Sequence, residues 1–315
     1  MLVYLLFILG LVLLLIGGDW LVKGSVGLAE KLSIPPLIIG LTIVAFGTSA
    51  PELVISLRAA LSGNGGISVG NVVGSNIANV LLVLGVPALF ASISCAGKNM
   101  NSTLFFLTGL TIVFMIQMGF GPISMIDGML LLACLIAFLT VQFRSARSHK
   151  QNSAEDDYKD EVGSVPSNPL AISGYMIAGL IALPFGASVA VDSAVEIATL
   201  WDISKEVIGL TVVAIGTSLP ELATGIMAAR QNNASVAVGN VIGSNIFNIA
   251  AIMGVTATVT AVPVGPHIVR FDMWIMFAAT LLLVGLSIFN VTLKKAAGIA
   301  LTSAYVAYLL ATAAF

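Results

Sequence analysis

Apolar residues fill almost the whole chain in long stretches that are separated by short polar connections. A helix that crosses a membrane needs about 20 mostly apolar residues, and ten stretches meet this requirement. Their approximate limits are 2–22, 37–61, 68–92, 103–120, 124–143, 169–192, 206–229, 236–260, 268–289 and 294–314. The pattern therefore predicts an all-α polytopic membrane protein with ten transmembrane helices.

The composition leads to the same class of protein. Hydrophobic residues make up 58% of the 315 residues and charged residues only 9%, whereas a soluble domain is about 25% charged. The first stretch has no basic residue before it and no small-residue cleavage site, which favours a retained helix over a signal peptide. Cys95 and Cys134 lie in or beside apolar stretches, so we expect buried thiols. Membrane lipid and ions are the expected partners, and nucleic acid is not.

One long polar segment, residues 144–168, divides the chain. It carries nine of the 28 charges (13 basic plus 15 acidic), which is typical of a solvated linker. The connections after stretches one, three, five, seven and nine contain ten of the 13 Lys and Arg residues. By the positive-inside rule this side is cytoplasmic. We therefore expect a multi-pass protein of the cell inner membrane, with a cytoplasmic linker and both termini outside.

The two halves of the chain repeat each other. The segment "IGLTIVAFGTSAPEL" (39–53) matches "IGLTVVAIGTSLPEL" (208–222), and "VGNVVGSNIAN" (69–79) matches "VGNVIGSNIFN" (238–248), both with an offset of 169. Over the first copy, residues 39–79, 24 of 41 positions are identical to the second copy, residues 208–248. Five predicted spans separate equivalent helices, so the second copy crosses the membrane in the opposite direction. This predicts two inverted five-helix repeats, 1–143 and 169–315, joined by the linker 144–168, with a binding site where they meet.

Each copy carries one glutamate near the middle of a predicted span, Glu52 and Glu221. The other acidic residues fall at predicted span ends or in connections, and no Lys or Arg lies deep enough to neutralise either glutamate. A charge at the bilayer centre costs about 2.5–3.5 kcal/mol even on the most lenient scale. Two unneutralised glutamates are therefore expected to bind a cation between them. The alternative is a protonated carboxyl group that forms a hydrogen bond between helices.

Polar side chains surround each glutamate at helical spacing. Thr48 and Ser49 precede Glu52 by four and three residues and share its face, while Pro51 disrupts the backbone hydrogen bond to Gly47. Thr217, Ser218 and Pro220 repeat this arrangement before Glu221. Carboxylate, hydroxyl and carbonyl oxygens suit hard cations such as Ca²⁺ and Na⁺. Neither histidine lies within a predicted span, so a zinc or copper site is not favoured.

The second motif adds amide side chains. Asn71, Ser75 and Asn79 are spaced by four residues in the first copy, and Asn240, Ser244 and Asn248 occupy the same positions in the second. A single such motif is as consistent with helix packing through amide hydrogen bonds as with ion binding. Its duplication beside the glutamates favours ion coordination.

The motifs "GTSAPE" with "GNVVGSNIAN" and "GTSLPE" with "GNVIGSNIFN" resemble the two α-repeats of the cation/calcium exchanger family, the sodium/calcium antiporters. The resemblance covers both halves and implies a cation site shared between them. The Ca²⁺ ligands that it implies are Glu52, Glu221, Thr48 and Thr217. The Na⁺ ligands that it implies are Ser49, Ser75, Ser218, Ser244, Ala45 and Ala214, with Asn79 and Asn248 completing the central site. It also implies that helices one and six slide across the other helices to alternate access.

The resemblance implies an antiporter that exchanges Na⁺ for Ca²⁺, with no enzymatic activity and no cofactor. Some prokaryotic members of the family carry Asp at the position of Asn248, whereas this chain has Asn in both copies. Two alternatives remain. A Ca²⁺/H⁺ antiporter on the same fold would not need the hydroxyl and amide ligands, and a passive cation channel fits an inverted repeat with one central site less well.

Overall fold

The computed structural model describes residues 2–96, 100–152, 166–202 and 214–314, and these residues are almost entirely helical. In the first half the elements are α1 (Leu2–Leu32), α2 (Pro36–Ile39), the π-helix η1 (Gly40–Val44), α3 (Ala45–Thr48), α4 (Ala50–Leu61), α5 (Gly65–Ala78), the π-helix η2 (Asn79–Val83), α6 (Gly85–Ala88), β1 (Ile93–Ser94), α7 (Met100–Gly119) and α8 (Met125–Asn152).

The second half is a similar series of helices, but its strand lies between the last two helices and not before them. Its elements are α9 (Pro169–Leu200), α11 (Ala214–Thr217), α12 (Leu219–Arg230), α13 (Ala234–Phe247), the π-helix η4 (Asn248–Met253), α14 (Gly254–Val259), the π-helix η5 (Ile268–Asp272), α15 (Met273–Ile288), β2 (Thr292–Leu293) and α16 (Lys295–Ala314). The two-residue strands β1 and β2 depart from the predicted all-α fold.

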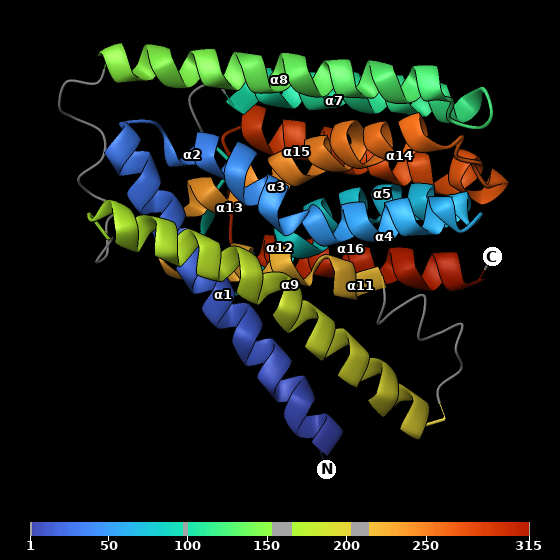
Figure 1. Cartoon of the computed structure of the whole chain (residues 1–315), viewed down its shortest axis with the longest axis horizontal. Helices are drawn as coiled ribbons and strands as arrows, with labels where there is room; N and C mark the ends of the chain where they lie inside the picture. Colours follow the sequence, from blue (N-terminus) through green and yellow to red (C-terminus); the bar gives the residue numbers. More distant parts are fainter. Residues whose placement is uncertain (1, 97–99, 153–165, 203–213, 315) are drawn as a thin grey trace.

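The two longest helices, α1 and α9, pack along each other and cross the other helices obliquely (Figure 1). Glycines bring their backbones together, because a Cβ atom added at Gly10 would lie 2.6 Å from Ala190 N. At Gly179, which is equivalent to Gly10 by the offset of 169, it would lie 2.7 Å from Leu21 N. The α1–α9 pair is therefore tightly packed over a long interface.

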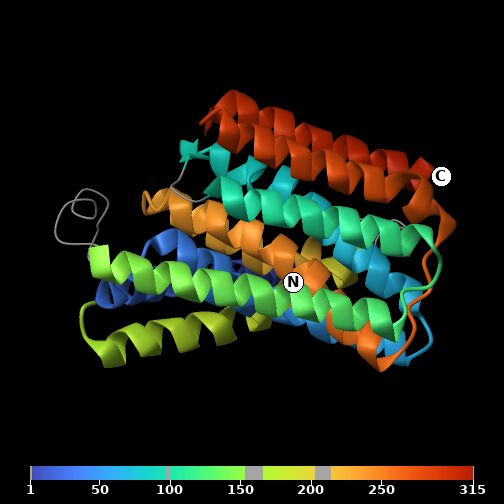
Figure 2. The same cartoon turned by 90° about the horizontal axis from the view of Figure 1, so that it is seen from above.

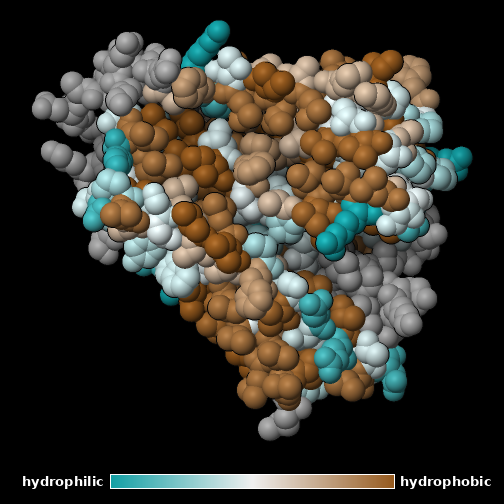
Figure 3. Space-filling model, viewed as in Figure 1, coloured by the Kyte–Doolittle hydropathy of each residue, from teal (hydrophilic) through white to brown (hydrophobic). Residues whose placement is uncertain are grey.

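The remaining helices form layers. In Figure 1, α7 and α8 form the outermost layer at the top, α14 and α15 lie beneath it, and α4 and α5 lie in the middle. Figure 2 shows α8 lying across the outer face of this arrangement. Most of the buried apolar side chains belong to one continuous core made by these layers. Apolar side chains also cover most of the surface seen in Figure 3, as expected for a protein that faces lipid.

Short backbone pairings join the ends of the helices. Strands β1 and β2 are antiparallel, with Ile93 opposite Leu293 and Ser94 opposite Thr292. A separate β-bridge joins Ile123 to Val262, with N–O distances of 2.9 and 3.0 Å. Connections from the two halves are therefore held together at two places.

The described residues contain fewer candidate spans than the ten predicted, and their limits differ. Eight described helices are long and apolar enough to cross a membrane, and a ninth candidate is the pair Pro36–Thr48 and Ala50–Leu61, bent by 43°. The predicted span 206–229 lies partly outside the described residues. Helix α1 extends ten residues beyond the predicted limit of 22, and α8 continues into the predicted linker as far as Asn152. Apolar runs could not indicate these ends, because the helices continue through polar residues.

Candidate cation-binding site

Both glutamates lie in the first turn of a helix that begins at a break in the chain. Ser49 (φ −86°, ψ 4°) separates α3 from α4, and Ser218 (φ −88°, ψ 5°) separates α11 from α12 in the same way. Pro51 and Pro220 lie at the start of the new helices, where a proline needs no backbone donor. Each carboxylate is therefore held near a helix N-terminus, where the unpaired backbone N–H groups favour negative charge.

The side chains of Glu52 and Glu221 are both buried, with 1% of each residue exposed. Ser49, three residues before Glu52, donates to Glu221 at 3.2 Å, which brings the chain segments of the two glutamates together. Within the described residues, the second carboxylate oxygen (Oε2) of each glutamate is buried and has no hydrogen-bond partner. A buried acceptor without a partner is costly, so these two oxygens mark a position that suits a cation.

Hydroxyl groups from the first copy reach across to the second copy. Ser49 Oγ donates to Glu221 Oε1 at 3.2 Å, and Thr48 Oγ1 donates to Asn240 Oδ1 at 3.2 Å. Thr48 Oγ1 also lies 3.5 Å from Ser244 Oγ. One buried cluster therefore contains Thr48 and Ser49 of the first copy and Glu221 and Ser244 of the second.

Two pairs of amide side chains also join the copies. Asn79 Nδ2 donates to Asn245 Oδ1 at 3.0 Å, and Asn248 Nδ2 donates to Asn76 Oδ1 at 3.4 Å. Asn79 Oδ1 and Asn248 Oδ1 are buried without hydrogen-bond partners in the described part of the chain, so each keeps one oxygen that could bind a cation. Sequence reasoning missed Asn76 and Asn245. Their recurrence at the offset of 169, directly after Ser75 and Ser244, was the signal that could have found them.

The other candidate residues differ in how far they are buried. Ser75 and Ala45 are buried, and the Ala45 carbonyl accepts from Thr48 Oγ1 at 3.4 Å. Ser218 is buried and its hydroxyl has no hydrogen-bond partner among the described residues. Thr217 is half-buried, and Ala214 begins α11 at the edge of the described region.

The structure adds detail on two further polar residues. The predicted span 2–22 places Asp19 at its end, but Asp19 lies in the middle of α1 because this helix extends to Leu32. The Asn71 amide nitrogen donates to the Glu52 carbonyl oxygen at 3.4 Å and to Ser56 Oγ at 2.9 Å, and ion binding by its side-chain oxygen stays a prediction.

Buried carboxylates with no base beside them, in a bundle of apolar helices, are typical of membrane proteins that bind and move cations. Residues 2–144 and 172–314 match the sequence profile of the sodium/calcium exchanger protein family. The chain therefore belongs to this family of transmembrane antiporters for calcium and sodium.

Relatives and a solved structure agree with this assignment. The chain is 35% identical to the inner membrane protein YrbG of Escherichia coli, over 88% of this chain and 86% of that protein. It is 32% identical to the sodium/calcium exchanger MaX1 of Methanosarcina acetivorans, over 97% of both chains. The fold matches the sodium-calcium exchanger NCX_Mj, soaked with 2.5 mM Na⁺ and 1 mM Sr²⁺, with a TM-score of 0.82 and 34% identity over 98% of both chains.

Proposed function

We propose that this protein exchanges Na⁺ for Ca²⁺ by alternating access to one central site between Glu52 and Glu221. The observation that carries the proposal is the pair of buried carboxylates, each with one oxygen that has no partner among the described residues. Two carboxylates balance the charge of one Ca²⁺, and the nearby hydroxyl and amide oxygens are ligands that both Ca²⁺ and Na⁺ accept. The family and its relatives MaX1 and NCX_Mj, both sodium/calcium exchangers by name, support the choice of ions.

We assign the remaining candidate residues to this site. The Ca²⁺ ligands would be Glu52 and Glu221 with Thr48 and Thr217. The hydroxyl groups and carbonyls for Na⁺ would come from Ser49, Ser75, Ser218, Ser244, Ala45 and Ala214, with Asn79 and Asn248 beside them. The cross-copy contacts of Ser49 and Thr48 support a site shared by the two halves.

Reciprocal contacts support the inverted repeat. In a two-fold arrangement, if residue i contacts j, then the equivalent of j contacts the equivalent of i. The offset of 169 converts the contact of Asn79 with Asn245 into the contact of Asn248 with Asn76, and both are present. The same operation relates the separate β-bridge to the β1–β2 pairing to within one residue. It converts Ile123 opposite Val262 into Thr292 opposite Ile93, and the structure pairs Ile93 with Leu293 and Ser94 with Thr292. Ten helices in two inverted repeats, 1–143 and 169–315, account for both pairs of contacts.

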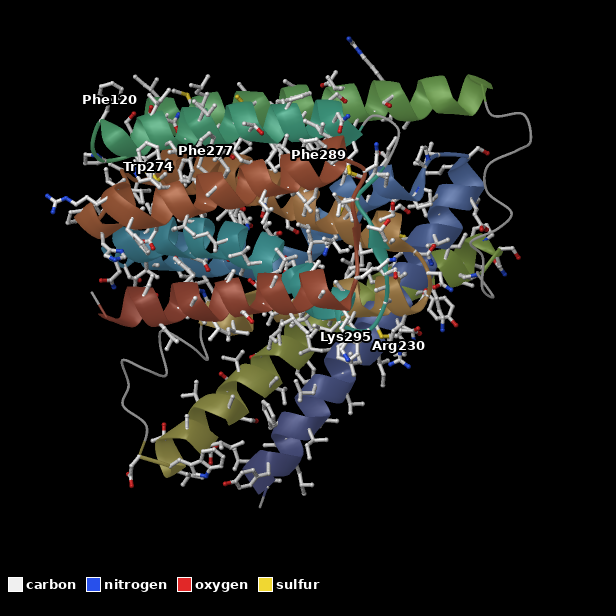
Figure 4. All side chains as sticks on the ribbon, turned by 180° about the vertical axis from the view of Figure 1, so that it is seen from behind. Phe120, Arg230, Trp274, Phe277, Phe289 and Lys295 are labelled. Carbon is white, nitrogen blue, oxygen red and sulfur yellow. The ribbon has the colours of Figure 1, made fainter. Side chains whose placement is uncertain are left out.

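The expected orientation places residues 144–168 in the cytoplasm and both termini outside. Figure 4 shows two of the basic residues on which this orientation depends. Arg230 and Lys295 lie near each other in this view, and Phe120 lies far from both. In the proposed topology the connections with Arg230 and Lys295 are cytoplasmic, and the connection with Phe120 is external.

Alternating access needs a surface along which one part moves, and α1 with α9 is the proposed moving pair. Its two helices are packed backbone to backbone. Helix α1 also contacts α12 at Gly18, close to Glu221, where an added Cβ would lie 3.0 Å from the Ala223 carbonyl oxygen. Movement of the pair along α12 would therefore open or close a path beside the glutamate.

Transport by purified protein in liposomes tests the proposal. We expect an outward Na⁺ gradient to drive uptake of radioactive calcium, and a pH gradient of equal size to drive none. Glu52→Gln and Glu221→Gln should each nearly abolish uptake, because one divalent ion needs both charges. Glu30→Gln, which makes the same change at an exposed position of α1, is the control and should leave uptake intact.

Each alternative predicts a different result. Uptake driven by the pH gradient would identify a Ca²⁺/H⁺ antiporter, and calcium flux that needs no counter-ion would identify a channel. Full Na⁺-driven exchange in either glutamine variant would refute the shared carboxylate site.

A further inference from the structure

Three polar side chains tie the helix of Glu52 to the next helix. Asn71, in α5, donates through Nδ2 to Ser56 Oγ at 2.9 Å and to the backbone carbonyl oxygen of Glu52 at 3.4 Å. Ser68, also in α5, donates through Oγ to the backbone carbonyl of Ser56. Ser56 and Ser68 are fully buried, and Asn71 is half-buried. We call these three residues the polar strap.

The strap acts on the turn that presents the Glu52 carboxylate. Ser56 follows Glu52 by four residues and lies on the same face of α4. An amide group carries two N–H bonds, and the two acceptors of Asn71 lie one turn apart, at Glu52 and Ser56. The first turn of α4 is therefore held to α5 by side chains as well as by its own backbone.

The second copy has no such strap. Ser56 and Ser68 correspond to Gly225 and Ala237, which have no polar side chain. Asn240, the equivalent of Asn71, instead accepts from Thr48 Oγ1 at 3.2 Å, and its Nδ2 is buried without a partner in the described part of the chain.

Packing explains why a serine is absent at position 225. A Cβ atom added at Gly225 would lie 3.3 Å from the Val83 carbonyl oxygen, closer than is usual for such contacts, and 3.4 Å from Pro87 Cγ. Helix α12 thus packs closely on the first half at the position where α4 has the hydroxyl group of the strap. The difference between the copies is therefore a feature of their packing as well as of their sequence.

We propose that Asn71, supported by Ser56 and Ser68, is a positioning residue that fixes Glu52 in its ion-binding geometry, while Glu221 lies on a helix without this restraint. This rests on the proposed function of Glu52 as a ligand. A ligand that is already ordered binds an ion more tightly, because binding no longer has to order it. The strap therefore raises Ca²⁺ affinity and has little effect on the movement that exposes the site to either side.

The test compares calcium affinity with maximal exchange rate in single and double variants. In Asn71→Ala we expect the KM for Ca²⁺ in Na⁺-driven uptake to rise about tenfold, the order expected for loss of hydrogen bonds of this kind, while the maximal rate changes by less than about twofold. Ser56→Ala should act in the same direction. The double variant should be no worse than Asn71→Ala, because the residues belong to one network.

Thr111→Val is the matched control. Thr111 is fully buried in α7, and its hydroxyl donates to the Leu107 carbonyl at 2.8 Å, so the change removes a buried hydroxyl group away from the strap. Its KM should equal that of the wild type. If Asn71→Ala does not give a monodisperse protein, Ser56→Ala and Ser68→Ala provide the same measurement.

An unchanged KM in variants that remain folded would overturn the proposal, as would a fall in maximal rate with a normal KM. Direct equilibrium binding of radioactive calcium to the detergent-purified protein separates this failure from failure of the proposed function. A wild type that binds calcium but does not exchange it for Na⁺ contradicts the exchange mechanism, and weaker calcium binding by Asn71→Ala would still support the strap.

Discussion

Two adjacent glycines of α1 face different neighbouring helices. Replacing each of them with alanine therefore distinguishes an effect on packing stability from an effect on the proposed movement. A Cβ at Gly17 would lie 3.0 Å from Ala182 Cβ and 3.1 Å from Leu183 N, both in α9. A Cβ at Gly18 would lie 3.0 Å from the carbonyl carbon and oxygen of Ala223 in α12. The added methyl group is therefore equally crowded at both positions, but it meets the proposed moving partner in one case and the proposed stationary surface in the other.

The expected magnitudes follow from these distances. Overpacking by one carbon costs about 1–3 kcal/mol, and the better helix propensity of alanine returns up to about 1 kcal/mol. Both variants should therefore lower the free energy of unfolding by a similar amount, about 0–2 kcal/mol. If α1 and α9 move together along α12, only Gly18→Ala strains the moving contact. A strain of about 1.4 kcal/mol in the barrier corresponds to a tenfold slower exchange.

Thermal unfolding in detergent measures the loss of stability. Initial rates of Na⁺-driven calcium uptake at saturating ion concentrations measure the rate of exchange. We expect Gly17→Ala to exchange at the wild-type rate within about twofold, and Gly18→Ala about tenfold more slowly. Equal slowing of both variants would refute movement of the α1–α9 pair as one unit. A normal rate in a destabilised Gly18→Ala would refute sliding along α12.

Two further predictions concern buried polar groups. Burial raises the pKa of the Cys95 thiol to about 11, so near neutral pH we expect the thiol to stay protonated and to react with maleimide only after the protein is unfolded. Mass spectrometry measures the labelling, and rapid labelling of the folded protein would contradict the burial of Cys95. Asn245→Leu removes the acceptor of Asn79 Nδ2 and should lower the free energy of unfolding by about 1–3 kcal/mol, measured by denaturation in detergent, whereas a stability equal to wild type would mean that this amide pair contributes nothing.

The sequence was sufficient to predict that Glu52 and Glu221 are buried, because both fall near the middle of long apolar stretches, and the structure buries both. Their role as ion ligands stays a prediction, which rests on the cost of a buried acid without a base and on its recurrence in the repeat. The sequence also predicted the polar neighbours, since Thr48 and Ser49 share the face of Glu52 at helical spacing. The contacts of these two hydroxyl groups are with Asn240 and Glu221 of the other copy. Contacts between the copies depend on how the two halves pack, and helical spacing within one copy carries no information about that packing.

Recurrence marks Asn76 and Asn245, but the partners of these amides could not be predicted, for a different reason. Helix α13 is buried on all sides from Val236 to Phe247, so its sequence has no polar face that distinguishes Asn245 from Asn240 or Asn248. Periodicity identifies the facing side of a helix only when one side meets solvent or lipid. The polar strap could not be predicted either, because the role of Ser56 and Ser68 depends on the distance between α4 and α5.

Differences between the copies have an energetic consequence for an antiporter built from inverted repeats. In a perfectly symmetric protein the two halves could exchange roles, so the states open to either side would have equal free energy. Only contacts that lack an equivalent can favour one state.

Asp19 of α1 accepts from Gln231 Nε2, at the end of α12, at 2.8 Å, whereas the equivalent positions hold Ser188 and Ser62. Ser188 donates to Asp192 and Ser62 to the carbonyl of Arg58, so each bonds within its own helix or at its end. A single hydrogen bond contributes about 1 kcal/mol, enough to populate one state several times more than the other. In such a protein the repeated residues build the site, and the unrepeated ones set the balance between its two sides.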